Sequence, residues 1–367
     1  MSQRTRPPFR ADHVGSLLRP AALKAAREAR AKGAIRPAEL QAVEDREIKE
    51  IVKKQEAVGL QSITDGEFRR SWWHLDFLWG LNGVEKHVMD TGVAFAAVTT
   101  RNEGVKVTGK LGFSGHPMIE HFKFLKANTA RTPKMTIPAP SALYGRPVAT
   151  PIDKSIYPKL DNFFADLGRA YNKAVRAFYD AGCRYLQLDE VFIAMLCDPR
   201  YRQQMKDRGD DPQALESIYG DLINAAISGI PVDMTVTMHL CRGNYKSTFM
   251  GAGGYDAVQA VLFDRIKVHG YFMEYDSERA GGFEPLGRLP KDRVAVLGLV
   301  TTKTGALEAK DAIKRRIEEA AKFVALDQLC LSPQCGFAST EEGNVLTEDQ
   351  QWAKLHMIGE VGREVWG

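Results

Sequence analysis

The sequence lacks long apolar stretches. No window approaches the roughly 18 apolar residues that a membrane-spanning helix needs, and the N-terminal MSQRTRPPFRADH is polar and basic, without the apolar region of a signal peptide. These absences predict a cytoplasmic protein that does not bind membranes. The sequence also has no Pro- or Gly-rich linker and no internal repeat with a period of about 20–50 residues, so we expect a single domain over residues 1–367.

Cysteine is scarce and odd in number. Five residues among 367, namely Cys183, Cys197, Cys241, Cys330 and Cys335, argue against a disulfide framework and favour buried thiols with a metal or catalytic set among them.

The net charge of the chain is small. The formal net charge is +4, and basic residues are balanced by acidic ones in helical segments such as KDAIKRRIEEAAKF. This balance is typical of solvated helix faces and predicts no nucleic-acid partner.

Strand-like runs alternate with amphipathic helical runs along most of the chain. Strands are predicted at the N-terminal RADHVGSLL and at 60–68, 105–113, 133–141, 183–191, 231–241, 270–277, 293–302 and 326–337. Helices are predicted around 163–181, 212–228, 255–264 and 307–325. About eight strands, most followed by helices, predict an α/β fold of the (β/α)8 TIM-barrel type, with a doubly wound sheet as the alternative. Residues 80–110 lack a clean helix and are expected to form an insertion near the strand mouths.

Polar clusters stand where the predicted strands end. They are His13-Val-Gly-Ser16, Asp65-Gly-Glu67, Gln187-Leu-Asp189-Glu190, His239-Leu-Cys241, Glu274-Tyr-Asp276-Ser277, Thr302-Lys303 and Gln334-Cys335-Gly336. Active sites of such barrels lie at the C-terminal ends of the strands. Because packing alone does not explain seven such endings, we expect them to surround one site.

Four of these residues form a candidate metal site. His239 and Cys241 are two positions apart on one strand and therefore face the same side. Glu274 ends the next strand and Cys335 the last, so a closed barrel places all four at one mouth. One nitrogen, two sulfurs and one oxygen suit zinc, and such a site favours holding an incoming thiol as its thiolate. An ordinary buried histidine and thiol remain the alternative at this stage.

The motifs HVGSLLRP, TDGEFRR, LQLDEV, HLCRGN, FMEYDSERAG and PQCGFAS, in this order, resemble the catalytic half of cobalamin-independent methionine synthase. The short single-barrel members are the most similar. The resemblance implies Zn2+ as cofactor, held by His239, Cys241, Glu274 and Cys335, and methyl transfer to the thiol of homocysteine. It also implies that Ser16 contacts the homocysteine carboxylate and that Glu67 and Asp189 hold its ammonium group. His13 belongs to the same set of expected substrate contacts.

Two departures from the family pattern leave the methyl donor open. Where the long enzymes carry a Trp that stacks on the folate pterin, this chain reads TIPAPSALYG (136–145), without Trp. Where they carry a histidine that protonates the leaving folate nitrogen, it reads LVTTKTG, so that Thr302 or Lys303 takes this place, and we assign Lys303 as a catalytic residue beside Glu67 and Asp189. The segment RRSWWHLDFLW (69–79) offers a replacement platform, in which Trp73 is a candidate substrate contact, or simply packs the insertion.

These features predict a zinc-dependent S-methyltransferase that uses a small-molecule thiol and a methylated folate, a methylcorrinoid or another small methyl donor. One alternative is a thiol alkyltransferase of the epoxyalkane–coenzyme M type, whose sulfonate would bind to basic residues near the strand mouths, Arg19, Arg69, Arg70 or Arg242. The paired carboxylates of Glu67 and Asp189 favour an amino-acid thiol instead. A non-catalytic zinc- or thiol-binding barrel is the second alternative. A homo-oligomer and a corrinoid partner both stay open.

Overall fold

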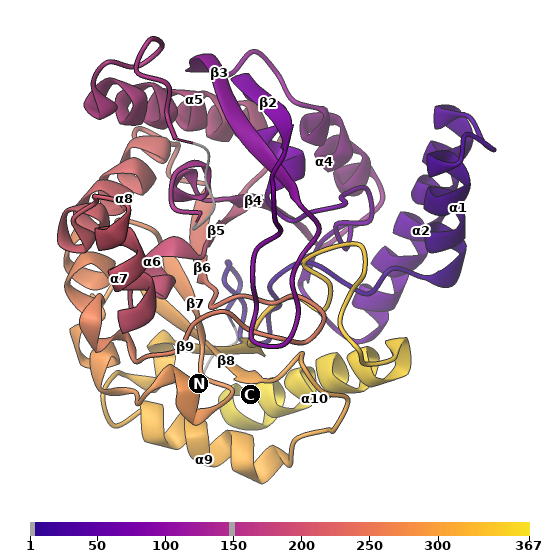
Figure 1. Cartoon of the computed structure of the whole chain (residues 1–367). Coiled ribbons are helices and arrows are strands. Elements are labelled where there is room, and N and C mark those ends of the chain that lie inside the picture. The colour runs from indigo at the N-terminus through magenta and orange to yellow at the C-terminus, as the bar shows by residue number, and fades with distance from the viewer. Residues whose placement is uncertain (1–3, 147–150) are drawn as a thin grey trace.

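A computed structural model describes residues 4–146 and 151–367, and its core is one parallel sheet of seven strands. The strand order is β1-β4-β5-β6-β7-β8-β9. The strands are β1 (Ser62–Ile63), β4 (Thr132–Pro138), β5 (Tyr185–Glu190), β6 (Thr235–Leu240), β7 (Gly270–Glu274), β8 (Val294–Val300) and β9 (Leu329–Pro333). The sheet curls on itself with helices around its outside, which confirms the predicted α/β barrel (Figure 1).

The N-terminal segment 10–17 lies between β9 and β1, where an eighth strand would close the ring. Ala11 pairs with Leu331 of β9 in a single parallel bridge. On the other side, the Thr64 hydroxyl donates a hydrogen bond of 2.6 Å to the Gly15 carbonyl. The predicted first strand is therefore an irregular segment, joined to β1 by side chains rather than by a backbone ladder.

A buried ion pair fixes this segment in the barrel. The Asp12 carboxylate accepts hydrogen bonds from the Ser62 hydroxyl (2.6 Å) and the Tyr185 hydroxyl (2.9 Å), and it lies 3.4 Å from the Lys134 ammonium. Both charged side chains are 0% exposed, and Lys134 also donates to the His13 carbonyl. Burial alone would raise the pKa of Asp12, but the Lys134 charge and the hydrogen-bond donors hold it below its usual value of 3.8.

Helices surround the sheet and its mouth (Figure 1). They are α1 (Ala21–Ala31), α2 (Pro37–Ala57), α3 (Leu75–Leu78), α4 (Pro117–Ala127), α5 (Leu160–Asp180), α6 (Phe192–Met195), α7 (Pro199–Asp207), α8 (Pro212–Ala226), α9 (Lys310–Ala320) and α10 (Glu348–Trp366). The predicted helices at 163–181, 212–228 and 307–325 correspond to α5, α8 and α9. No helix in the described parts of the chain combines the length and apolar character needed to span a bilayer.

The helix predicted at 255–264 is present, but it is not an α-helix. This stretch forms a short 3-10 turn, Tyr255–Ala257, and a π-helix, Ala260–Arg265. The Ile266 amide bonds to the Val261 carbonyl five residues back, while the Tyr271 hydroxyl donates to the Leu262 carbonyl at 2.8 Å. The tyrosine thus occupies the acceptor that an α-helical bond would use, and the turn widens.

The predicted insertion is a β-hairpin of β2 (Asn82–Val88) and β3 (Glu103–Gly112), which pair antiparallel outside the main sheet. The strand predicted at 105–113 therefore does not belong to the barrel. Its burial alternates, with Val105 and Val107 buried and Lys106 exposed, whereas β5 and β8 are buried along their whole length. The loop 89–102 between the hairpin strands extends over the barrel mouth, as expected for the insertion (Figure 1).

Candidate metal and substrate site

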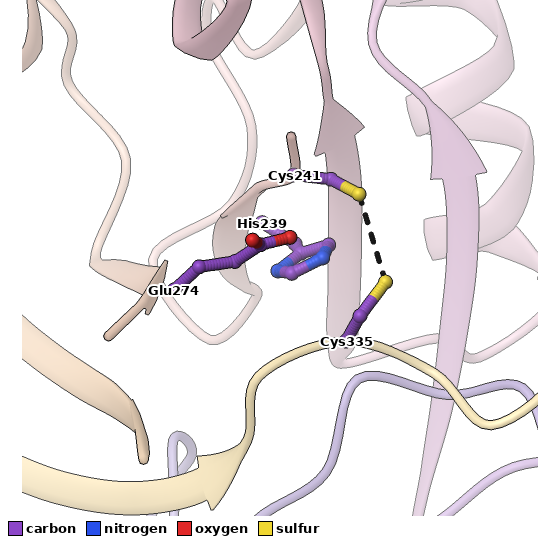
Figure 2. Close-up of side chains that lie close together, drawn as sticks. All are labelled: His239, Cys241, Glu274 and Cys335. Atoms are coloured by element: carbon purple, nitrogen blue, oxygen red, sulfur yellow. Dashed lines mark hydrogen bonds between the residues drawn. The ribbon is translucent and has the colours of Figure 1, made fainter. Parts of the chain in front are cut away.

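His239, Cys241, Glu274 and Cys335 converge at the barrel mouth (Figure 2). One potential ligand atom from each side chain lies within 4.8 Å of the other three, and all four residues are buried. His239 lies at the end of β6 and Glu274 at the end of β7, while Cys241 directly follows β6 and Cys335 is the second residue after β9. The structure thus brings together residues that are up to 96 positions apart in the chain, from His239 to Cys335.

A glycine on the neighbouring strand lets the tail of β9 turn into this mouth. A Cβ on Gly298 of β8 would lie 2.7 Å from the Gln334 Cα and 2.8 Å from the Met273 carbonyl oxygen. Both are backbone atoms, which have no room to move aside. Any larger residue at position 298 would displace the segment that carries Cys335.

The two thiols are coupled to each other. Their sulfur atoms are 3.6 Å apart, and the Gly243 amide donates to the Cys241 sulfur at 3.3 Å. The hydrogen bond from Cys241 holds the pKa of Cys335 well below its ordinary value, whereas the same contact raises the pKa of Cys241 well above it. The protein alone therefore stabilises one thiolate in the pair.

The residues present fit a metal ion. Both ring nitrogens of His239 are buried without a hydrogen-bond partner among the described residues. Buried polar atoms normally have a partner, so an imidazole with none, next to two thiols and a carboxylate, indicates a missing ligand. The donor set of one nitrogen, two sulfurs and one oxygen suits a borderline-soft ion.

A pocket with largely apolar and aromatic walls opens beside the metal group. His239, Cys241 and Cys335 line it directly. The candidate substrate contacts that also line it are Ser16, Glu67, Trp73 and Asp189. Four of the five predicted substrate contacts thus share one pocket with residues of the metal group.

Glu67 and Asp189 present two buried carboxylates to the pocket. Glu67 Oε1 accepts a hydrogen bond from Thr136 at 2.8 Å and lies 3.5 Å from Arg70, while Oε2 has no partner among the described residues. Asp189 Oδ1 accepts from Gln187 at 2.7 Å. Burial, with a further contribution from the Glu67 charge, raises the pKa of Asp189 to about 7, and burial also raises the pKa of Glu67. Two such carboxylates favour the binding of a cation.

The TDGEF motif forms a tight turn and also places Glu67. Gly66 and Glu67 have φ angles of 65° and 61°, and the Asp65 carboxylate accepts a hydrogen bond of 2.9 Å from the Glu67 amide. A residue with a side chain rarely adopts this left-handed conformation. The motif therefore provides both a tight turn and a side chain of the pocket lining.

Two of the candidate substrate and catalytic residues, His13 and Lys303, lie outside the pocket lining. The His13 Nε2 atom is 3.0 Å from the Ser62 carbonyl oxygen, and burial lowers the His13 pKa to about 4, so the ring is neutral. The Lys303 ammonium lies 3.3 Å from the Gly243 carbonyl and 3.2 Å from the Asn244 side-chain oxygen. This contact holds the loop that follows β6, so the structure gives Lys303 a positioning role there.

The arginines considered for sulfonate binding are also outside the lining. Arg19 donates to the Ala338 carbonyl, Arg69 pairs with Glu44, Arg70 donates to the Thr136 carbonyl and Arg242 donates to the Tyr255 hydroxyl. Each is occupied by protein groups, which removes the support for a sulfonate site at these residues.

Sequence reasoning missed Arg146 and three aromatic residues of the pocket, Phe95, Phe192 and Tyr245. Arg146 follows β4, so its position past a strand end was the available signal. Trp72 stacks on Tyr245 with ring centroids 6.3 Å apart, and its indole also bonds to Glu103 of β3. The aromatic segment 69–79 thus both lines the pocket and packs the insertion.

The family model described as cobalamin-independent synthase, catalytic domain, matches residues 116–352, a range that contains all four residues of the metal group. The chain belongs to the cobalamin-independent methionine synthase family. Ser16 and Glu67 lie outside the matched range, and only their place in the pocket connects them to it.

Similar proteins cover most of the chain. "Uncharacterized protein YxjH" of Bacillus subtilis is 50% identical over 98% of this chain and 95% of its own length, and the "Methionine synthase" of Pyrococcus abyssi is 26% identical over 78% and 73%. A solved structure described as a putative vitamin-B12 independent methionine synthase from Listeria monocytogenes has a TM-score of 0.80 and 42% identity, covering 99% of this chain and 100% of that one. A B12-independent methionine synthase from Shewanella, in complex with selenomethionine, shares the fold at 19% identity with a TM-score of 0.70, covering 96% of each chain.

Proposed function

We propose that this chain transfers a methyl group to the thiol of homocysteine, with a zinc ion bound by His239, Cys241, Glu274 and Cys335. The observation that carries the proposal is the buried set of metal-binding side chains beside a pocket with two carboxylates. Family membership supports the reaction, since relatives of this chain are named methionine synthase.

Bound zinc would supply a binding site for the acceptor sulfur as its thiolate, which is the nucleophilic form of a thiol at neutral pH. Two thiolates and one carboxylate around Zn2+ give a formal charge of −1, because +2 and −3 sum to −1. Glu274 would be the ligand to make way for the substrate sulfur, because its carboxylate has a charged partner as well as a backbone one: the Arg279 guanidinium lies 3.4 Å away and the Arg242 amide donates to it at 3.1 Å.

The remaining pocket residues orient the acceptor. Glu67 and Asp189 bind the homocysteine ammonium group, and Ser16, whose hydroxyl lies at the tail of β9, contacts its carboxylate. In the transfer, the bond between sulfur and methyl carbon forms as the bond between donor and methyl carbon breaks. The electron pair of the broken bond stays with the donor, and the thiol proton has left before the attack.

The two carboxylates provide a test that separates substrate binding from structure. Glu67→Gln and Asp189→Asn are each expected to raise the KM for homocysteine by about 10- to 100-fold, the size of a lost charge-assisted hydrogen bond. A thiol of the same length without the amine should be hardly affected, because it has no ammonium group to lose. Steady-state kinetics with both thiols measures the difference.

Glu120→Gln is the matched control, because the Glu120 side chain is 72% exposed on α4 and pairs only with Lys123 among the described residues. It should leave both KM values unchanged. If the amine-free thiol suffers as much as homocysteine in the Glu67 and Asp189 variants, the two carboxylates do not bind the ammonium group.

The direct test of the reaction is methionine formation from homocysteine with a panel of donors: methyltetrahydrofolate, methylcobalamin, and small methyl sulfonium or thioether compounds. We expect mass spectrometry to detect methionine with at least one of them. If homocysteine binds but none of the donors reacts, the chain is a thiol-binding barrel without this activity.

A further inference from the structure

The pocket contains a buried positive charge that the protein does not neutralise. Arg146 is 4% exposed. Among the described residues its guanidinium makes two long contacts, 3.4 Å to the Glu103 carbonyl and 4.0 Å to the Met89 sulfur. Burial alone lowers its pKa to about 10, with no acidic group opposing the shift. The segments 1–3 and 147–150 contain no Asp or Glu that would serve as a partner.

Other buried arginines of the barrel make short hydrogen bonds or an ion pair, which Arg146 lacks among the described residues. Arg70 donates to the Thr136 carbonyl at 2.6 Å and lies 3.5 Å from the Glu67 carboxylate. Arg242 donates to the Gly253 carbonyl at 2.7 Å and stacks over the Tyr255 ring at 4.0 Å. An uncompensated buried charge is costly to folding. Its presence in a pocket therefore indicates a ligand that carries the opposite charge.

Aromatic rings form the walls beside Arg146. The His74 ring lies at a centroid distance of 4.4 Å from Trp73, and burial together with the Arg146 charge keeps the pKa of His74 well below its usual value, so the ring is neutral. Phe192 packs directly against the backbone of Gly145, where a Cβ would lie 2.5 Å from the phenylalanine ring. Apolar walls exclude water from the guanidinium and strengthen its attraction for an anion.

We propose that Arg146 binds the acidic group of the methyl donor, so that the physiological donor is an anion. The inference rests on the proposed methyl transfer for the identity of this ligand. The charges of the pocket then bind the two substrates at different places. Glu67 and Asp189 attract the amine of the acceptor and repel an acid, while Arg146 attracts the acid of the donor. The acid is a carboxylate, either on the glutamate tail of a methylated folate or on a small methylated acid.

Binding measurements distinguish these sources without requiring turnover. The probes are methyltetrahydrofolate, a methyl sulfonium carboxylic acid and the methyl ester of that acid, titrated calorimetrically into the full-length, metal-loaded protein. For whichever acid binds, Arg146→Gln is expected to raise the Kd by about 10- to 100-fold, and Arg146→Lys by less, because lysine keeps the charge but loses the planar fork. The Kd values of the ester and of homocysteine should not change.

Two further measurements separate a ligand site from a structural arginine. Arg146→Gln should unfold at a temperature no lower than the wild type in the absence of ligand, since it removes an unpaired buried charge. Arg169→Gln, at a 68% exposed position, controls for the loss of one positive charge and should leave every Kd unchanged. The inference is overturned if neither acid binds the wild type, or if acid and ester weaken equally in Arg146→Gln.

Methyl-transfer assays on the same variants keep this inference distinct from the proposed function. Acid binding that depends on Arg146, without methyl transfer, would leave the anion site standing and remove the reaction. Methyl transfer that proceeds unchanged in Arg146→Gln would leave the reaction standing and remove the anion site.

Discussion

Cys241→Ser and Cys335→Ser are each expected to weaken zinc binding by about a hundred- to a thousandfold and to lower methionine formation by at least about a hundredfold. A four-ligand zinc site contributes about 10–16 kcal/mol of binding free energy, so the loss of one thiolate costs roughly a quarter of it, or about a hundred- to a thousandfold in affinity. The serine hydroxyl is a poor replacement because it stays protonated at neutral pH. Without the metal, the acceptor thiol loses the group that keeps it ionised.

Metal analysis of protein purified without chelators measures this effect, and about one zinc per chain is expected in the wild type. Cys183→Ser is the matched control. Its thiol is equally buried, donates to the Tyr185 carbonyl at 3.2 Å, and has a pKa that burial raises to about 12, so it is neither a thiolate nor part of the metal group. Zinc that persists at full occupancy in both the Cys241 and the Cys335 variants would show that the ligands are misassigned.

Asp12→Ala should destabilise the fold more than a change at any exposed position. It leaves the Lys134 ammonium buried without its carboxylate, and breaking a buried ion pair from one side costs about 3–5 kcal/mol. The same change removes the acceptor for Ser62 and Tyr185, which anchor the N-terminal segment to β1 and β5. Chemical denaturation measures the loss in the free energy of unfolding.

The double variant Asp12→Asn with Lys134→Met is the control, because it removes both charges. It should lose less stability than Asp12→Ala, and an equal or greater loss would show that the ion pair is not the cause.

The pH dependence of stability provides a second test of the ion pair. The pKa of Asp12 is lowered in the folded state, so its contribution to stability is complete above the ordinary value of 3.8 and is lost as the pH falls through the folded value. The wild type should therefore lose stability below about pH 4 more steeply than the double variant.

The metal group could be predicted from sequence because its geometry follows from simple rules. Residues two apart on a strand share a face, and the ends of parallel strands in a barrel share a mouth, so His239 and Cys241 point to where Glu274 and Cys335 also lie. The helices α5 and α8 could also be predicted from sequence, because an amphipathic pattern over 15 or more residues is typical of a helix alone.

Features that depend on a partner far along the chain could not be predicted from the sequence. The run 105–113 is a good strand by composition, but nothing local indicates that it pairs with β2 rather than with the barrel. Arg146 follows a strand end, which is a signal the sequence offers, but its lack of an acidic partner among the described residues is visible only after the pocket is assembled. His13 stood in a promising motif, yet its ring turns toward Ser62 because the N-terminal segment bonds to β1 through side chains.

The join between the N-terminal segment and the tail of β9 also sets an order of events during synthesis. The Ala338 amide donates to the Ser16 hydroxyl across 322 positions of the chain. At about 5–20 residues per second, a ribosome makes the second partner roughly 15–65 seconds after the first. During that time the ring of strands stays open and the metal group lacks Cys335. A chain released before β9 is complete therefore has neither a closed barrel nor a full set of ligands, and activity arises only with the last steps of translation.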